Sequence, residues 1–210
     1  EIPKSITSTS DSRWPRAALD YFILQRLQQE QLVPSRDADA LTLLRRLSFV
    51  LTGLPPTAQL VRTFPEQYER SPDEALQSLV DQLLESPHFG ERFARHWMDV
   101  VRYSDTYGYE WDNPAKGSWQ YRDYLIRAFN RDISFQQLIR EQIAGDLLPV
   151  QRVDEATGFQ ESLIGPMFYH MGEHRHGDNE VINGVREEMI DNKVAAFSNA
   201  FLAITIACAR

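Results

Sequence analysis

Histidines and carboxylates are concentrated in the segment YHMGEHRHGDNE, which spans residues 169–180. Its candidate metal ligands are His170, His174, His176, Asp178 and Glu180. The last four alternate with other residues, so in an extended backbone their side chains would share one face. Imidazole and carboxylate groups suit zinc, iron or manganese. The segment therefore predicts a divalent metal site; the competing interpretation, favoured by its two glycines, is a solvated polar loop.

A second acidic group lies in DTYGYEWDNPAKG, residues 105–117, where glycines, a proline and aromatic residues follow no regular period and indicate a loop. Its carboxylates are Asp105, Glu110 and Asp112. Flexible loops rich in oxygen ligands can bind calcium, although this spacing does not fit an EF-hand. The commoner role for such acids is hydrogen bonding within the loop. The interleaved aromatic residues would then pack the loop down or offer a stacking surface.

A third set follows one side of a predicted helix at positions i, i+4, i+7 and i+11. It consists of Arg92, His96, Asp99 and Tyr103, with Arg102 beside it. A histidine that titrates near neutrality and is oriented by an aspartate could act as an acid or base. The commoner alternative is a structural network between packed helices. The apolar stripe expected to face the core comprises Phe89, Phe93, Trp97 and Val100.

Apolar residues recur at helical spacing along most of the chain, and strand-like alternation is scarce. Helices are predicted after Pro15, after a capping Asp37 or Asp39, from Ser71, Ser86, Ser118 and Ser134, and within 182–210. The apolar run 200–209 is expected to be part of a core helix. These elements predict an all-α fold, an irregular bundle of about six to eight helices with long loops.

Length and composition favour one domain over residues 1–210, with a possible sub-boundary near 150–180. The net charge of −8 offers no basic surface for nucleic acid, and no apolar run reaches the roughly 20 residues of a membrane span. Since the first residue is Glu1, we expect a fragment whose targeting peptide lies outside it. The usual serine-nucleophile, phosphate-loop and zinc-helix signatures are absent from the sequence.

Several long stretches closely resemble the planctomycete cytochrome C domain family, a domain of unknown function found in large exported proteins. They are LTLLRRLSFVLTGLPPT, LVDQLLESPHFGERFARHWMDVVRYSDTYGYE, YRDYLIRAFNRDISFQQLIREQIAGDLLP and ATGF. The resemblance runs from about Asp20 to the last residue. In that family the closing segment, here DNKVAAFSNAFLAITIACAR, leads into a Cys-x-x-Cys-His motif.

The resemblance implies that Cys208, the only cysteine, is the first thiol of a c-type haem attachment motif. Composition alone favours a small buried core residue at this position. The second cysteine and the histidine are absent, so we expect no cofactor in this fragment and a haem in its parent protein. The family context also implies export to the periplasm or cell envelope, and other domains of the same parent chain as partners.

Three functions follow from these observations. The first is a redox role beside a haem, in which His170, His174 or His176 could be a distal ligand. The second is a metal-dependent hydrolase with a small-molecule or carbohydrate ligand. The third is a non-catalytic helical scaffold that docks neighbouring domains.

Overall fold

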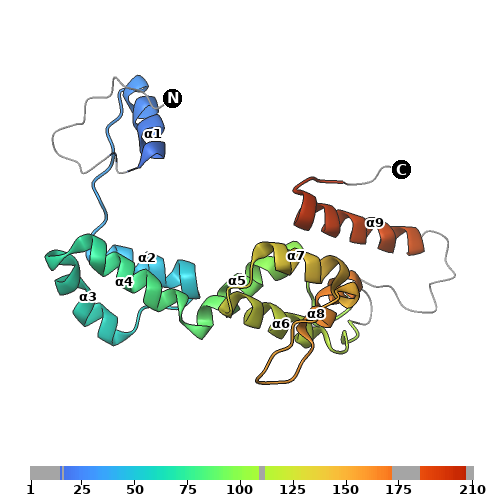
Figure 1. Ribbon diagram of the computed structural model, residues 1–210. Coiled ribbons are helices and arrows are strands. Elements are labelled where there is room, and N and C mark those ends of the chain that lie inside the picture. Colours follow the sequence, from blue (N-terminus) through green and yellow to red (C-terminus); the bar gives the residue numbers. More distant parts are fainter. Residues whose placement is uncertain (1–14, 16, 109–111, 172–184, 207–210) are drawn as a thin grey trace. The chain divides into compact units, whose positions relative to one another are not determined.

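The computed structural model describes residues 15, 17–108, 112–171 and 185–206. Among these residues there are nine α-helices and no strand, which confirms the all-α prediction (Figure 1). The α-helices are α1 Ala18–Gln29, α2 Ala40–Thr52, α3 Ala58–Arg70, α4 Pro72–Leu84, α5 Pro87–Val100, α6 Ser118–Asn130, α7 Phe135–Ala144, α8 Glu161–Ile164 and α9 Val185–Phe197. Within the described part of the chain, no helix is both long and apolar enough to cross a bilayer.

The chain divides into two compact units, Glu1–Leu43 and Leu44–Arg210. The first unit contains α1, which buries Leu24 and ends with a backbone bond from Leu32 N–H to the Leu27 carbonyl (2.8 Å). Gln31 adopts a positive φ at this helix end, as the C-terminal Schellman motif requires. The predicted sub-boundary near 150–180 stays a prediction.

Side-chain caps begin several of the helices. Asp39 is the cap at the start of α2, because its carboxylate accepts the Thr42 N–H at 2.8 Å. Ser86 and Ser134 accept backbone N–H groups at the starts of α5 and α7, as predicted. Ser71 precedes α4 without a side-chain cap bond, so the predicted cap is wrong there, and Pro72 with the first-turn acids Asp73 and Glu74 favours the start.

The helix α3 was not predicted, because Pro65 lies inside it and interrupts the helical signal. Its Phe64 is nevertheless fully buried, together with Leu44 of α2 and Leu79 of α4. Burial of this apolar face compensates for the backbone bond that the proline cannot donate. Tertiary packing, rather than local propensity, therefore determines this helix.

The main core of the second unit lies where α5 and α6 pack side by side with α7 and the 3-10 segment η2, Gly165–His170 (Figure 1). A second 3-10 segment, η1, Gly145–Leu147, contacts α7, α8 and η2. The buried members of this core cluster are Ala94, Val101, Tyr121, Tyr124, Leu125, Ala128, Leu138 and Phe168. The predicted core stripe of α5 is partly wrong: Val100 is 42% exposed, whereas Val101 is 1% exposed.

The last predicted helix is shorter than expected. After α9, a π-helical turn η4, Ser198–Leu202, ends at Ala203, which has a positive φ of 52°. Residues 203–206 are not helical, and Ile204 and Ile206 are exposed. The β-branched residues after Ala203 disfavour continuation of the helix, so this part of the apolar run is not a core helix.

Replacement of Gly90 by alanine should destabilise the fold, although alanine is the better helix former. A Cβ at Gly90 would lie 2.4 Å from the Ile126 carbonyl oxygen and 2.5 Å from Asn130 Cγ. We expect Gly90→Ala to lower the free energy of unfolding by about 1 to 3 kcal/mol through this overpacking, measured by urea denaturation. The exposed α4 variant Gln77→Ala is the control; greater stability in Gly90→Ala would contradict the packing described.

Candidate functional site

The predicted acid-base stripe on α5 does not form a connected site in the structure. His96 and Asp99 are both exposed, and no hydrogen bond links them among the described residues. Arg102 donates instead to Asn192 of α9 at 3.4 Å, and the Tyr103 hydroxyl donates to Asp105 at 2.6 Å. The geometry favours local structural contacts over the proposed histidine–aspartate pair.

Most of the predicted metal ligands lie outside the described residues, namely His174, His176, Asp178, Glu180 and Glu110. Cys208 lies outside them as well. Of the others, His170 is exposed at the end of η2, and Asp112 accepts a 2.5 Å hydrogen bond from Thr106 within the loop. No three potential ligands converge on a metal position in the part of the chain that is described. The metal site stays a prediction.

Three buried carboxylates form an ionic cluster between α6, α7, α8 and the loop before α8. Glu141, Glu161 and Asp154 are each at most 1% exposed. Each one pairs with an arginine: Glu141 with Arg152, Glu161 with Arg127, and Asp154 with Arg131. Buried carboxylates are costly unless they are paired and hydrogen-bonded, so this cluster constrains how its elements pack.

The Glu141–Arg152 pair has the most complete set of contacts in the cluster. Arg152 donates Nε to Oε1 at 2.8 Å and Nη2 to Oε2 at 2.7 Å, a bidentate geometry. The same carboxylate accepts bonds from Tyr124 (2.9 Å), Gln137 (3.0 Å) and Ser162 (3.2 Å). Burial raises the pKa of Glu141, but the hydrogen bonds from Arg152 and Gln137 outweigh it and hold the pKa below its usual value.

Two buried tyrosines extend this cluster into the apolar core. Tyr121 donates to Gln142 at 2.6 Å, and its ring lies 6.0 Å from that of Tyr124. Burial raises the pKa of both hydroxyls well above the usual value, and the Glu141 carboxylate raises that of Tyr124 further. Both groups therefore stay protonated and act as donors.

Glycines allow the backbones around this cluster to approach closely. A Cβ on Gly165 of η2 would lie 2.3 Å from the Glu141 carbonyl oxygen, and one on Gly145 would lie 1.8 Å from that of Ser162. A side chain at Gly165 would push η2 away from α7, and one at Gly145 would push η1 away from α8. The glycines and the ion pairs thus fix η2 in one place.

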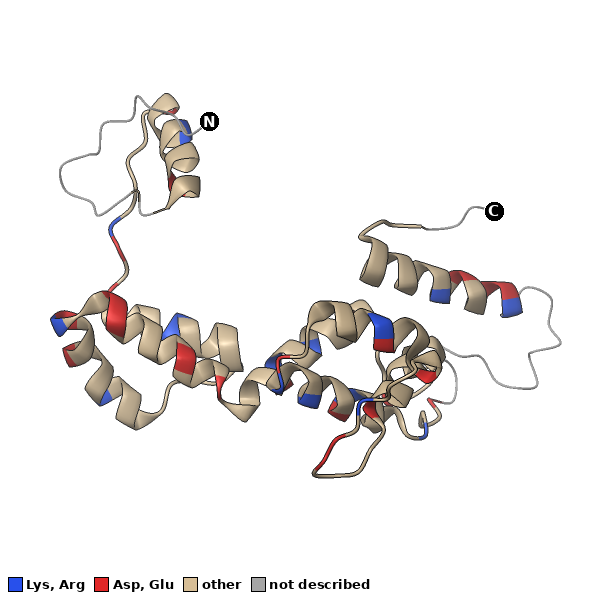
Figure 2. Cartoon of the chain, viewed as in Figure 1, with Lys and Arg blue, Asp and Glu red and all other residues tan. Residues whose placement is uncertain are grey.

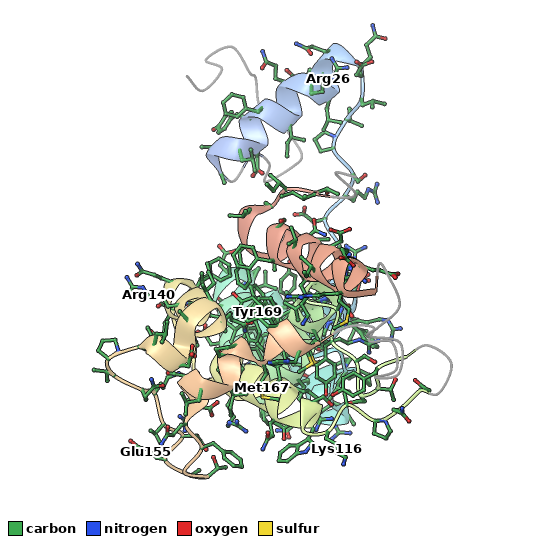
Figure 3. The ribbon with its side chains drawn as sticks, turned by 90° about the vertical axis from the view of Figure 1, so that its right-hand side faces the viewer. Arg26, Lys116, Arg140, Glu155, Met167 and Tyr169 are labelled. Carbon is green, nitrogen blue, oxygen red and sulfur yellow. The ribbon has the colours of Figure 1, made fainter. Side chains whose placement is uncertain are left out.

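Aromatic rings join η2 to the turn that follows α9. Phe201 of η4 lies 5.4 Å from Phe168, 6.0 Å from Trp97 and 5.0 Å from Phe197, measured between ring centroids. Met167 and Tyr169 of η2, labelled in Figure 3, pack against the main core cluster, as do Trp97, Phe197 and Phe201. We call Trp97, Phe168, Phe197 and Phe201 the aromatic anchor, because they hold the end of the last helical segment against the core.

Sequence reasoning missed both the ionic cluster and the aromatic anchor. Arg127 and Glu161 are 34 residues apart in sequence, and nothing in the local pattern pairs them. A weaker signal was available in the apolar context of Glu141, since an acid inside LIREQIA needs a partner if that helix face is buried. The aromatic residues were visible, but their spacing indicated only a core.

The chain matches one family model, PSCyt2, described as a protein of unknown function (DUF1549), over residues 18–210. PSCyt2 is the planctomycete cytochrome C domain family that the sequence resembles. No curated protein and no solved structure matches the chain.

Neutralising Glu141 should cost more stability than neutralising an exposed acid. Glu141→Gln leaves the guanidinium of Arg152, whose side chain is 18% exposed, without its charged partner. We expect a loss of about 3 to 5 kcal/mol in the free energy of unfolding, measured by denaturant titration. The matched control is Glu30→Gln, which breaks the exposed Arg26–Glu30 pair of α1 and should cost less than about 1 kcal/mol. Equal effects would contradict the buried pairing.

The same variant should change the pH dependence of stability. Because the folded pKa of Glu141 is below its unfolded value, this residue stabilises the fold above about pH 4.3 and loses that effect as the pH falls through the folded pKa. The free energy of unfolding should therefore fall more steeply in acid for the native sequence than for Glu141→Gln. If the free energies of unfolding of the two proteins changed in parallel with pH, Glu141 would not contribute to the pH dependence of stability.

Proposed function

Since the chain belongs to the PSCyt2 family of cytochrome c-associated domains of unknown function, we propose that it is the helical domain of an exported, multidomain c-type cytochrome-like protein. In this proposal the domain positions the segment that contains Cys208 and contributes to electron transfer between that segment and another domain of the parent chain. The resemblance of the closing segment to a haem-attachment sequence motivates the redox role.

The aromatic anchor is the structural observation that best supports this proposal. Phe201 precedes Cys208 by seven residues and is packed against Trp97 and Phe168. The chain after Phe201 therefore starts from a position fixed to the core. Seven residues of extended chain reach at most about 25 Å, so a group attached at Cys208 would lie within that distance of the anchor.

The residues of this chain do not by themselves fit a complete c-type site. The sequence has one cysteine, whereas the attachment motif uses two thiols and an iron-binding histidine. A haem, when bound, supplies one-electron transfer at its iron. The proposal assigns to this chain the positioning of Cys208 and derives no haem chemistry from its residues.

The test uses the parent protein, expressed together with a c-type maturation system. We expect visible haem bands that remain with the polypeptide under denaturing conditions, because thioether bonds survive denaturation. Cys208→Ala should abolish or greatly reduce this covalently retained haem. A parent protein without covalent haem would refute the proposal.

A second variant separates positioning from attachment. Phe201→Ala removes one ring of the aromatic anchor and leaves Cys208 in place, so haem should still attach, but the reduction potential or the rate of electron exchange should change. The control is Phe49→Ala, which removes a partly exposed ring of α2.

Elemental analysis of the same preparations tests the alternative function, a metal enzyme. That function would be favoured if the protein contained no haem but held stoichiometric zinc, iron or manganese, and if replacing His174 and His176 by alanine removed the metal.

A further inference from the structure

A cavity of about 360 Å³ lies among the residues that follow α5, the end of η2 and one face of α9. This volume is within the range typical of small-molecule sites. The cavity is separate from the aromatic anchor and from the ionic cluster, apart from Phe168, which contributes to its wall. The loop acids Asp105 and Asp112 are not among its described lining residues.

The charges of this cavity differ in sign from those of the whole protein. The chain has a net charge of −8, yet the described residues that line the cavity include Arg102 and Lys193 and no carboxylate. No described side chain forms a hydrogen bond or ion pair with the Lys193 ammonium. Figure 2 shows positive and negative residues together on α9, the helix that contributes Lys193 to this cavity.

The rest of the wall combines hydroxyl groups with apolar surface. Ser104 and Thr106 line one part, and Phe168, Met171 and Met189 line another. Methionine and phenylalanine offer adaptable contacts to a flat apolar body, especially an aromatic ring. A few polar groups that converge on a mainly apolar hollow are the usual composition of a small-molecule site.

The backbone directs Arg102 to this position. The Tyr103 N–H donates a hydrogen bond to the Met98 carbonyl at 2.9 Å. The helix α5 therefore ends in a Schellman motif, in which Arg102 is the left-handed residue with a φ of 60°. Glycine is the residue that this conformation favours, and an arginine there adds backbone strain. Arg102 also contacts Asn192 of α9, which joins the two sides of the cavity.

We propose that this cavity binds a small organic anion, with a carboxylate or phosphate group held by Arg102 and Lys193 and a ring-sized apolar body against Phe168, Met171 and Met189. The anionic group satisfies two cations that no acid of the described wall neutralises. The apolar body fills the hollow between η2 and α9. This inference does not require a haem and stands independently of the proposed redox role.

Calorimetric titration of the purified chain tests this with three related probes: 2-naphthoate, 2-naphthyl phosphate and the neutral 2-naphthamide. We expect saturable binding of at least one anion, about tenfold tighter than that of the neutral amide, because each cation contributes a favourable contact. The preferred anion distinguishes a carboxylate ligand from a phosphate ester. Equal affinity for the amide, or no saturable binding of either anion at millimolar concentration, would overturn the proposal.

Two variants of the lining residues, each with its own control, assign the binding to this cavity. Lys193→Met keeps the apolar stem and removes the charge, and should weaken anion binding about fivefold, which corresponds to about 1 kcal/mol. Arg140→Gln removes an exposed charge on α7, labelled in Figure 3, and should leave the affinity unchanged. Equal losses of anion affinity in Lys193→Met and Arg140→Gln would show a general charge effect and refute the assigned site.

Arg102→Gly separates binding from folding. Glycine suits the left-handed position at the end of α5, so thermal unfolding should occur at the same temperature or higher, while anion affinity should fall about fivefold. Asp132→Gly makes the equivalent change at the end of α6, where φ is 47°, and should keep the affinity. Unchanged anion affinity in Arg102→Gly would refute the role of this residue.

Discussion

The bidentate pair between Glu141 and Arg152 is the interaction on which the arrangement of the second unit depends. It joins α7 to the loop before α8, and its carboxylate also receives donors from α6 and α8. A charge buried this deeply is tolerated only when every partner is in place. The pair therefore selects one packing of these elements, whereas apolar contacts alone would accept several similar ones.

Close backbone contact and aromatic packing follow from this constraint. Gly165 lets η2 approach the backbone of α7, and Phe168 on the same short segment then reaches both the core and Phe201. Gly165 of η2 thus contacts the backbone of the cluster residue Glu141, and Phe168 of η2 contacts the ring of Phe201. A segment with little regular structure of its own thereby connects the rigid helices to η4, the turn that follows α9.

The sequence was sufficient for the fold class and for most helix starts, because apolar periodicity and capping residues are local signals. It was insufficient where distant contacts override local preference. Pro65 concealed α3, which burial of Phe64 stabilises, and the β-branched residues after Ala203 did not prevent the prediction of a longer last helix. At the candidate sites, the helical spacing predicted a pair between His96 and Asp99, whereas in the structure both are exposed and no hydrogen bond links them among the described residues. The arginine partners of Glu141 and Glu161 come from separate elements, so no spacing rule could identify them.

The shortness of α8 has a dynamic consequence. Four residues are too few to form a stable helix alone, and η2 is only six residues long. Both depend on the same supports: the Arg127–Glu161 pair, the close approach at Gly165 and the burial of Phe168. None of these supports can be lost without loosening the others, so residues 161–170 form one cooperative unit. Their backbone amides should open and exchange with solvent together, and the stability of this unit sets how long the end of η2 stays in place.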